Sequence, residues 1–108
     1  MSKSPVFHIT AIAVVLGTTA VALAQGVPTL DFNALCRAEA KQGPNLAEPC
    51  VADQKKARED LVRQWSQFPA ADRASCLAVV NSVPGMQSYI ELLTCLQIKQ
   101  DVRALPKR

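Results

Sequence analysis

Four cysteines, at positions 36, 50, 76 and 95, constrain the fold of this 108-residue chain more than any other feature. The intervals between them contain 13, 25 and 18 residues. Structural zinc sites usually hold pairs of ligands only about two to four residues apart, so these long intervals favour disulfides over a metal site. Disulfides form and persist in oxidising compartments, and the amino-terminal sequence indicates such a destination.

The first 24 residues have the features of a secretory signal. Lys3 precedes an uncharged run over residues 11–24. That run ends in Ala22-Leu23-Ala24, the pattern of small residues that signal peptidase accepts. We therefore predict cleavage between Ala24 and Gln25, with the mature protein periplasmic or secreted. An uncleaved membrane anchor is the alternative, because the uncharged run 6–24 approaches the ~20 apolar residues that a spanning helix needs.

Removal of the signal changes the chemistry that the chain can support. The remaining 84 residues carry eleven basic and nine acidic side chains, a balance that gives no electrostatic reason to expect a nucleic-acid partner. A membrane partner is expected only if the signal is retained. The single histidine, His8, is lost with the signal, so the mature chain has no histidine base and no histidine metal ligand.

Proline and glycine divide the mature chain into four helical segments, and no alternating strand pattern occurs. We predict an all-α, four-helix domain over residues 31–104, built as two helical hairpins and stabilised by two disulfides. A linker over 25–30 precedes this domain, and a frayed basic tail over 105–108 follows it. The predicted helices cover residues 31–42, 49–68, 70–82 and 88–104.

Apolar residues at helical spacing predict which faces of these helices are buried. In the second helix they are Cys50, Ala57, Leu61, Trp65 and Phe68. The third helix is expected to bury Cys76, Val79, Val80 and Val83. In the fourth, the stripe consists of Leu92, Cys95, Leu96, Lys99 and Val102.

Ser88 and Glu91 have the spacing of a capping box at the start of the fourth helix. Gly43-Pro44 and Pro84-Gly85 are expected to end the first and third helices, with Gly43 left-handed.

The helical hairpins also predict how the cysteines pair. The second and third helices turn near residue 68, which places Cys50 ~27 Å and Cys76 ~12 Å from the turn. A disulfide needs α-carbons within ~7 Å, so these two cannot be bonded to each other. Cys36 and Cys50 are equally distant from Gly43, and Cys76 and Cys95 are nearly equidistant from Gly85. The predicted pairs are Cys36–Cys50 and Cys76–Cys95.

No constellation of residues indicates catalysis, a cofactor or a metal. A cysteine nucleophile would need a base or a cationic neighbour, and pairing leaves no cysteine over. Glu59 and Asp60 are adjacent on a helix, so their carboxylates point to different faces, among basic residues. This arrangement is typical of a solvated helix surface and not of a catalytic pair of carboxylates. Trp65, Phe68 and Tyr89 either pack in the core or form an apolar contact face for a protein or an apolar ligand.

The sequence resembles small exported four-cysteine proteins of alpha-proteobacteria. The similarity lies in WSQFPAADR at 65–73, in Cys76 and in SYIELLTCL at 88–96. It implies a periplasmic address and no particular activity. The preferred prediction is a non-enzymatic binding or envelope-accessory module. The alternatives are a periplasmic stress-protective chaperone and a subunit tethered to the membrane by an uncleaved signal.

Overall fold

Residues 2–5, 11–13 and 26–107 are described in a computed structural model of the chain. Within residues 26–107 the secondary structure is helical, which confirms the predicted all-α class. The α-helices are α2 (Asn33–Gln42), α3 (Ala47–Gln64), α4 (Ala70–Val80) and α5 (Tyr89–Ala104). Two short 3-10 turns flank α3, namely η1 (Pro44–Leu46) before it and η2 (Trp65–Gln67) after it.

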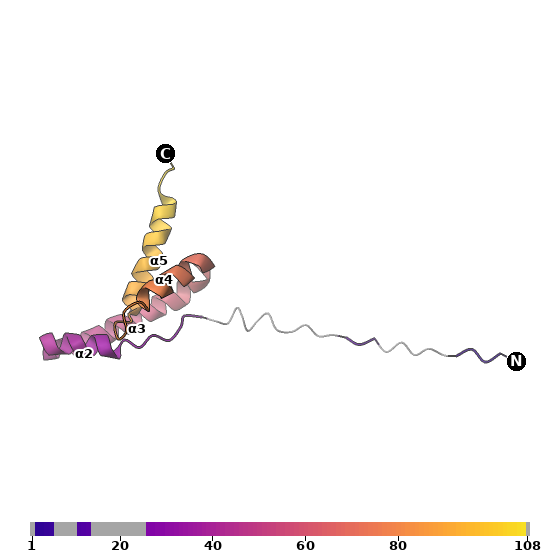
Figure 1. Ribbon diagram of the computed structural model, residues 1–108, viewed down its shortest axis with the longest axis horizontal. Helices are drawn as coiled ribbons and strands as arrows, with labels where there is room; N and C mark the ends of the chain where they lie inside the picture. Colours follow the sequence, from indigo (N-terminus) through magenta and orange to yellow (C-terminus); the bar gives the residue numbers. More distant parts are fainter. Residues whose placement is uncertain (1, 6–10, 14–25, 108) are drawn as a thin grey trace.

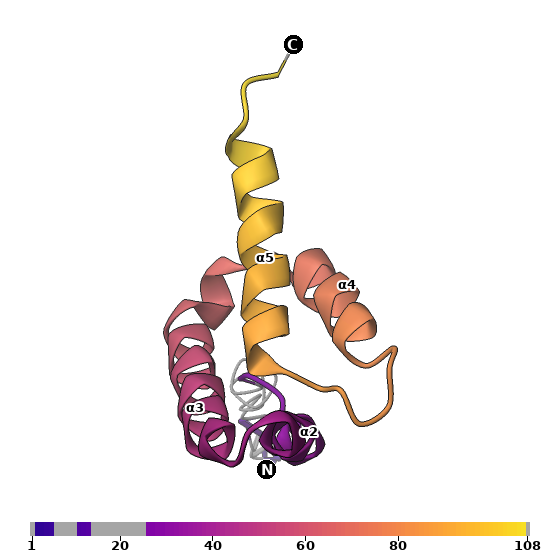
Figure 2. The same ribbon diagram turned by 90° about the vertical axis from the view of Figure 1, so that its left-hand side faces the viewer.

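Helix α5 is the centre of the domain. It lies between α3 and α4 and packs on both (Figure 2). Helix α2 packs on α3 near the amino-terminal end of α5. The carboxy-terminal part of α5 extends past the ends of α3 and α4, toward the carboxy terminus of the chain (Figures 1 and 2). Among the described residues, no other helix packs along this last part of α5.

The two predicted disulfides are confirmed. Cys36–Cys50 joins α2 to α3, with 5.5 Å between the α-carbons. Cys76–Cys95 joins α4 to α5, with 5.7 Å between the α-carbons. Each bond therefore links the two helices of one hairpin, at matching distances from the turn between them. All four cysteines are paired.

One hydrophobic cluster holds α3, α4 and α5 together. The buried residues of α3 recur on the face that packs against α5, and α5 contributes residues from its first two turns. Partly buried side chains of the amino-terminal segment and of α4 also pack against the cluster. The cluster consists of Leu30, Ala57, Leu61, Trp65, Phe68, Cys76, Val80, Tyr89, Leu92 and Leu96.

Several helix boundaries differ from the predicted ones. Helix α2 begins at Asn33, because Asp31 accepts a hydrogen bond from the backbone N–H of Asn33 (3.0 Å) and lies before the first turn. Helix α3 begins at Ala47, since η1 leads directly into it, and Pro49 lies in its first turn, where no intrahelical N–H donor is needed. The α-helical part of α3 ends at Gln64, and η2 carries the chain on to Phe68.

The two glycines at helix ends behave differently. Gly43 was expected to be left-handed, but its φ of −169° is extended, and its N–H donates to the carbonyl of Glu39 (3.2 Å). Gly85, in the connection between α4 and α5, has a φ of +75°. That conformation strains any residue with a β-carbon, so glycine is required only at the second of these turns.

Three valines that were expected to face inward are exposed, namely Val79, Val83 and Val102. Helix α4 turns Asp72, Cys76 and Val80 inward, which leaves Val79 on the other side. Val83 follows the end of α4, which stops at Val80 instead of Ser82. Val102 lies in the part of α5 that extends past its neighbours. Periodicity identified the helices correctly here but overestimated how far the core continues along them.

Residues 26–30, the described part of the segment that was predicted as a linker, pack against the domain. Leu30 is buried in the cluster, and its N–H donates to the hydroxyl of Tyr89 (2.8 Å). That hydroxyl in turn donates to the carbonyl of Pro28 (3.2 Å). The N–H of Asp31 donates to the side-chain oxygen of Gln87 (2.9 Å). The folded domain therefore includes residues that precede position 31.

Candidate functional site

The aromatic residues that were candidates for an apolar contact face are part of the core. Phe68 and Tyr89 are almost fully buried, and Trp65 retains 8% of its exposure. Phe32 packs edge-on against the Tyr89 ring, with 5.9 Å between ring centroids. Trp65, Phe68 and Tyr89 therefore do not form an exposed face, because all three belong to the buried cluster that joins α3, α4 and α5. Exposed apolar side chains lie elsewhere.

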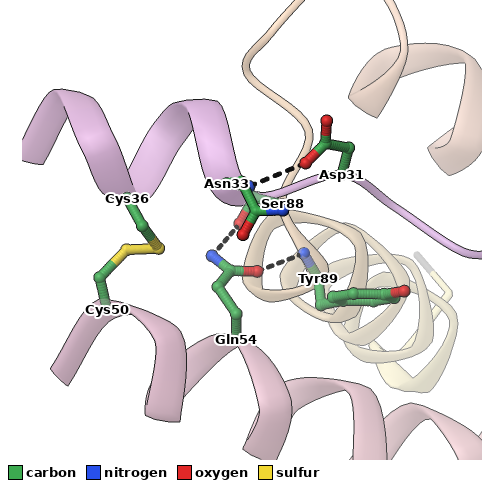
Figure 3. Close-up of a disulfide and its surroundings, with 7 residues drawn as sticks. All are labelled: Asp31, Asn33, Cys36, Cys50, Gln54, Ser88 and Tyr89. Carbon is green, nitrogen blue, oxygen red and sulfur yellow. Dashed lines mark hydrogen bonds between the residues drawn. A yellow bond between two sulfur atoms is a disulfide. The ribbon is translucent and has the colours of Figure 1, made fainter. Parts of the chain in front are cut away.

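A buried glutamine connects α3 to the start of α5, and the sequence-based reasoning missed it. Gln54 is 1% exposed. Its amide nitrogen donates to the hydroxyl of Ser88 (2.9 Å), and its carbonyl oxygen accepts the N–H of Tyr89 (2.7 Å; Figure 3). The Ser88 hydroxyl also accepts the N–H of Glu91 (3.3 Å), which is the helix cap that the sequence predicted. A polar residue on an otherwise apolar helix face was the available signal for this role.

Replacement of Gln54 by methionine is expected to lower the free energy of unfolding by about 2 kcal/mol. Methionine has a similar size but cannot accept the Tyr89 N–H, so a buried donor at the start of α5 loses its partner. Chemical denaturation followed by circular dichroism measures this change. The matched control is Gln97→Met at an exposed position of α5, where an effect within ~0.5 kcal/mol is expected. Equal effects of the two substitutions would contradict the capping role of Gln54.

One group of exposed apolar side chains lies at the extended end of α5. We call it the α5 stripe and define it as Ile98, Val102 and Leu105, which are 57%, 61% and 64% exposed. Ile98 and Val102 are four residues apart on one side of α5, and Leu105 is the C-cap residue directly after the helix. Among the described residues nothing covers this part of α5, which extends beyond the other helices (Figures 1 and 2).

An ion pair borders the α5 stripe. Asp72, in the first turn of α4, is buried, and its carboxylate pairs with the guanidinium of Arg103. Asp72 and Arg103 line a shallow hollow together with Ile98, Lys99 and Val102. Because removing Arg103 would leave a buried carboxylate without its partner, the pair helps to fix the direction of α5 relative to α4.

A second surface feature is an open groove beside the only tryptophan. We call it the Trp65 groove; its volume is about 610 Å³. The amino-terminal segment forms one side and α4 forms the other. The groove is lined by Gly26, Val27, Pro28, Trp65, Ala70, Arg73, Ala74 and Leu77. The guanidinium carbon of Arg73 lies 5.4 Å from the centroid of the Trp65 ring, within the range of a cation–π contact. No local sequence pattern predicts this groove, because its walls come from distant segments.

Within residues 2–5, 11–13 and 26–107, no group of three or more histidine, cysteine or acidic side chains could hold a metal ion. Glu59 and Asp60 do not act together, since Asp60 pairs with Arg63 one turn further along α3. The surface chemistry of the described domain is therefore that of apolar side chains and scattered charges.

The candidate cleavage residues Ala22, Ala24 and Gln25 lie outside the described residues. No helix in the described part of the chain is both long and apolar enough to cross a membrane. The two disulfides indicate that the domain folds in an oxidising compartment outside the cytoplasm.

Comparison of the chain with family models, with curated proteins and with solved structures finds no match. The resemblance to exported four-cysteine proteins therefore stays a prediction.

Proposed function

We propose that this chain is a non-enzymatic binding module, periplasmic or secreted, that docks another protein through the α5 stripe. The observation that carries the proposal is the extension of α5 past α3 and α4, with three large apolar side chains exposed there. Grouped apolar side chains of this kind commonly mark interaction sites on soluble proteins.

The domain holds this helix in place before any partner arrives. Cys76–Cys95 bonds α5 to α4 just before the stripe begins, and the Asp72–Arg103 pair adds a second contact further along. At the other end of α5, the hydrogen bonds from Gln54 fix its first turn. A helix fixed in this way loses little conformational entropy on binding, which favours affinity.

The charges beside the α5 stripe indicate the chemistry of the partner. Lys99 and Lys107 are basic, Arg103 is paired with Asp72, and Asp101 is the only acidic residue between positions 97 and 107. An apolar groove that receives residues at positions i and i+4 of a helix and the residue after its end, with an acidic rim, fits this arrangement. We therefore expect the partner to be an exported protein with such a groove.

The proposal predicts that Ile98→Ser combined with Val102→Ser removes binding without unfolding the domain. The full chain is produced by export, its amino terminus is established by intact mass, and proteins captured from envelope and culture extracts are identified. A purified captured protein is then titrated, and the double variant is expected to raise Kd at least about tenfold.

The control for this experiment is Val62→Ser combined with Val79→Ser, because both valines are exposed to a similar degree on other helices. The control should bind like the unmodified chain. Retention of the same protein by both double variants would contradict docking through the α5 stripe. A monomer–dimer equilibrium that only the Ile98/Val102 variant abolishes would also contradict it, because the stripe would then bind a second copy of this chain.

A further inference from the structure

We propose that the Trp65 groove binds a small amphipathic carboxylate, with the carboxylate at Arg73 and an apolar body along the groove. This site is separate from the α5 stripe and does not depend on the proposed docking function. Its volume of about 610 Å³ lies within the range of small-molecule sites.

The side chains that line the groove are apolar except for Arg73, and polar backbone atoms contribute to the rest of its surface. Valine, proline, alanine, leucine and tryptophan side chains form its walls, and Arg73 is the only charged residue among them. No acidic side chain lines the groove. A ligand that complements these walls has a single negative charge on a hydrocarbon or aromatic body.

Arg73 is held in place by packing and not by a carboxylate. Its guanidinium lies over the Trp65 ring, and its buried Nε has no hydrogen-bond partner among the described residues. Neither of the two ion pairs between described residues involves Arg73; they join Arg63 to Asp60 and Arg103 to Asp72. Its positive charge is thus uncompensated beside an apolar surface, where a carboxylate gains more from a charged hydrogen bond than in water.

The wall opposite α4 is also fixed. Tyr89 accepts the N–H of Leu30 and donates to the carbonyl of Pro28, which holds the segment that carries Val27 and Pro28. Trp65 is buried beneath the groove, whereas Ala70 and Ala74 are exposed at α4. The groove is therefore formed before a ligand enters, which lowers the entropy that binding must overcome.

Trp65 is the only tryptophan of the chain, so its fluorescence reports directly on this groove. The exported full chain is titrated with decanoate below the concentration at which decanoate forms micelles. Decanol and acetate are titrated in parallel, because they lack the charge and the apolar body respectively. We expect a saturable change of tryptophan emission with decanoate, binding at least about tenfold weaker with decanol, and no saturable change with acetate.

Two substitutions, each with a matched control, test the roles of the Arg73 charge and of the space in the groove. Arg73→Gln should weaken decanoate binding at least about tenfold and leave decanol binding unchanged, whereas Arg58→Gln, an exposed charge on α3, should change neither. Ala74→Phe should block both ligands by filling the groove, and Ala78→Phe, at an exposed position of α4 that does not line the groove, should block neither. Arg73→Lys keeps the charge and serves if Arg73→Gln fails to fold by circular dichroism; it should retain the preference for decanoate over decanol.

Three results would overturn the proposal. One is the absence of any saturable emission change with decanoate. Another is equal affinity for decanoate and decanol, which would show that Arg73 does not select the ligand. The third is equal binding by the Ala74→Phe and Ala78→Phe variants, which would place the ligand outside the groove.

Discussion

Replacement of both Cys76 and Cys95 by alanine is expected to lower the free energy of unfolding by about 4 kcal/mol. Loss of the crosslink accounts for ~3 kcal/mol in the chain-entropy description, and the gap left at Cys76 adds to this because that side chain is fully buried in the hydrophobic cluster. A domain of this size has a total stability of only about 5–10 kcal/mol, so the variant should be close to unfolding at physiological temperature. Thermal unfolding followed by circular dichroism measures the loss.

The matched comparison is replacement of Cys36 and Cys50 by alanine, because the disulfide between them closes a loop of similar length. Cys36 is the only buried residue of α2, so this bond is the main attachment of α2 to the rest of the domain. We expect local unfolding of α2, seen as lost hydrogen-exchange protection over residues 33–42, while α3, α4 and α5 keep their protection. Loss of protection throughout the domain in this variant would show that α2 is an integral part of the cooperative core.

The cysteine pairing could be predicted because it depends on distances along helices. Once proline and glycine had indicated the turns, the unequal distances of Cys50 and Cys76 from the turn between their helices excluded a bond between them. The presence and order of the four helices were predictable for the same reason, although several of their boundaries differ from the predicted ones. The predicted capping role of Ser88 was also correct, because a helix cap involves residues only three positions apart.

Contacts between distant segments could not be predicted. Gln54 reaches Ser88 and Tyr89 across 34 and 35 positions, and the Tyr89 hydroxyl bonds to Leu30 across 59. The position of Gln54 on an apolar helix face indicates burial, but no local pattern identifies the residues that it or Tyr89 contacts. The placement of α5 between α3 and α4, with an end that extends past both, likewise depends on packing, and it decides that Val102 is exposed.

The same limit applies to the candidate sites. Sequence periodicity placed Trp65 and Phe68 on one helix face, but it could not decide whether these side chains and Tyr89 form a buried cluster or a surface that binds a partner. The Trp65 groove needs residues 26–28 to lie beside α4, and this follows only from the hydrogen bonds of Tyr89. The α5 stripe has the right spacing in the sequence, yet its exposure follows only from where the neighbouring helices end.

Leu61→Ala is expected to lower the free energy of unfolding by about 3 kcal/mol. The Leu61 side chain is fully buried, on the face of α3 that packs against α5, and its truncation leaves a cavity that rigid neighbouring helices cannot fill. A cluster of only ten residues has few other contacts to compensate. Chemical denaturation, with the slope of the transition unchanged, measures the loss.

Val62→Ala is the control, since Val62 is the next residue of α3 but is 54% exposed. It removes apolar atoms from the same helix and changes helix propensity only slightly, so its effect should stay within ~0.5 kcal/mol. The difference between the two variants isolates the contribution of burial against α5 from that of the helix itself. If Leu61→Ala were no more destabilising than Val62→Ala, α3 would not pack on α5 as described. In that case the Gln54 hydrogen bonds, which depend on the same packing, should also be absent.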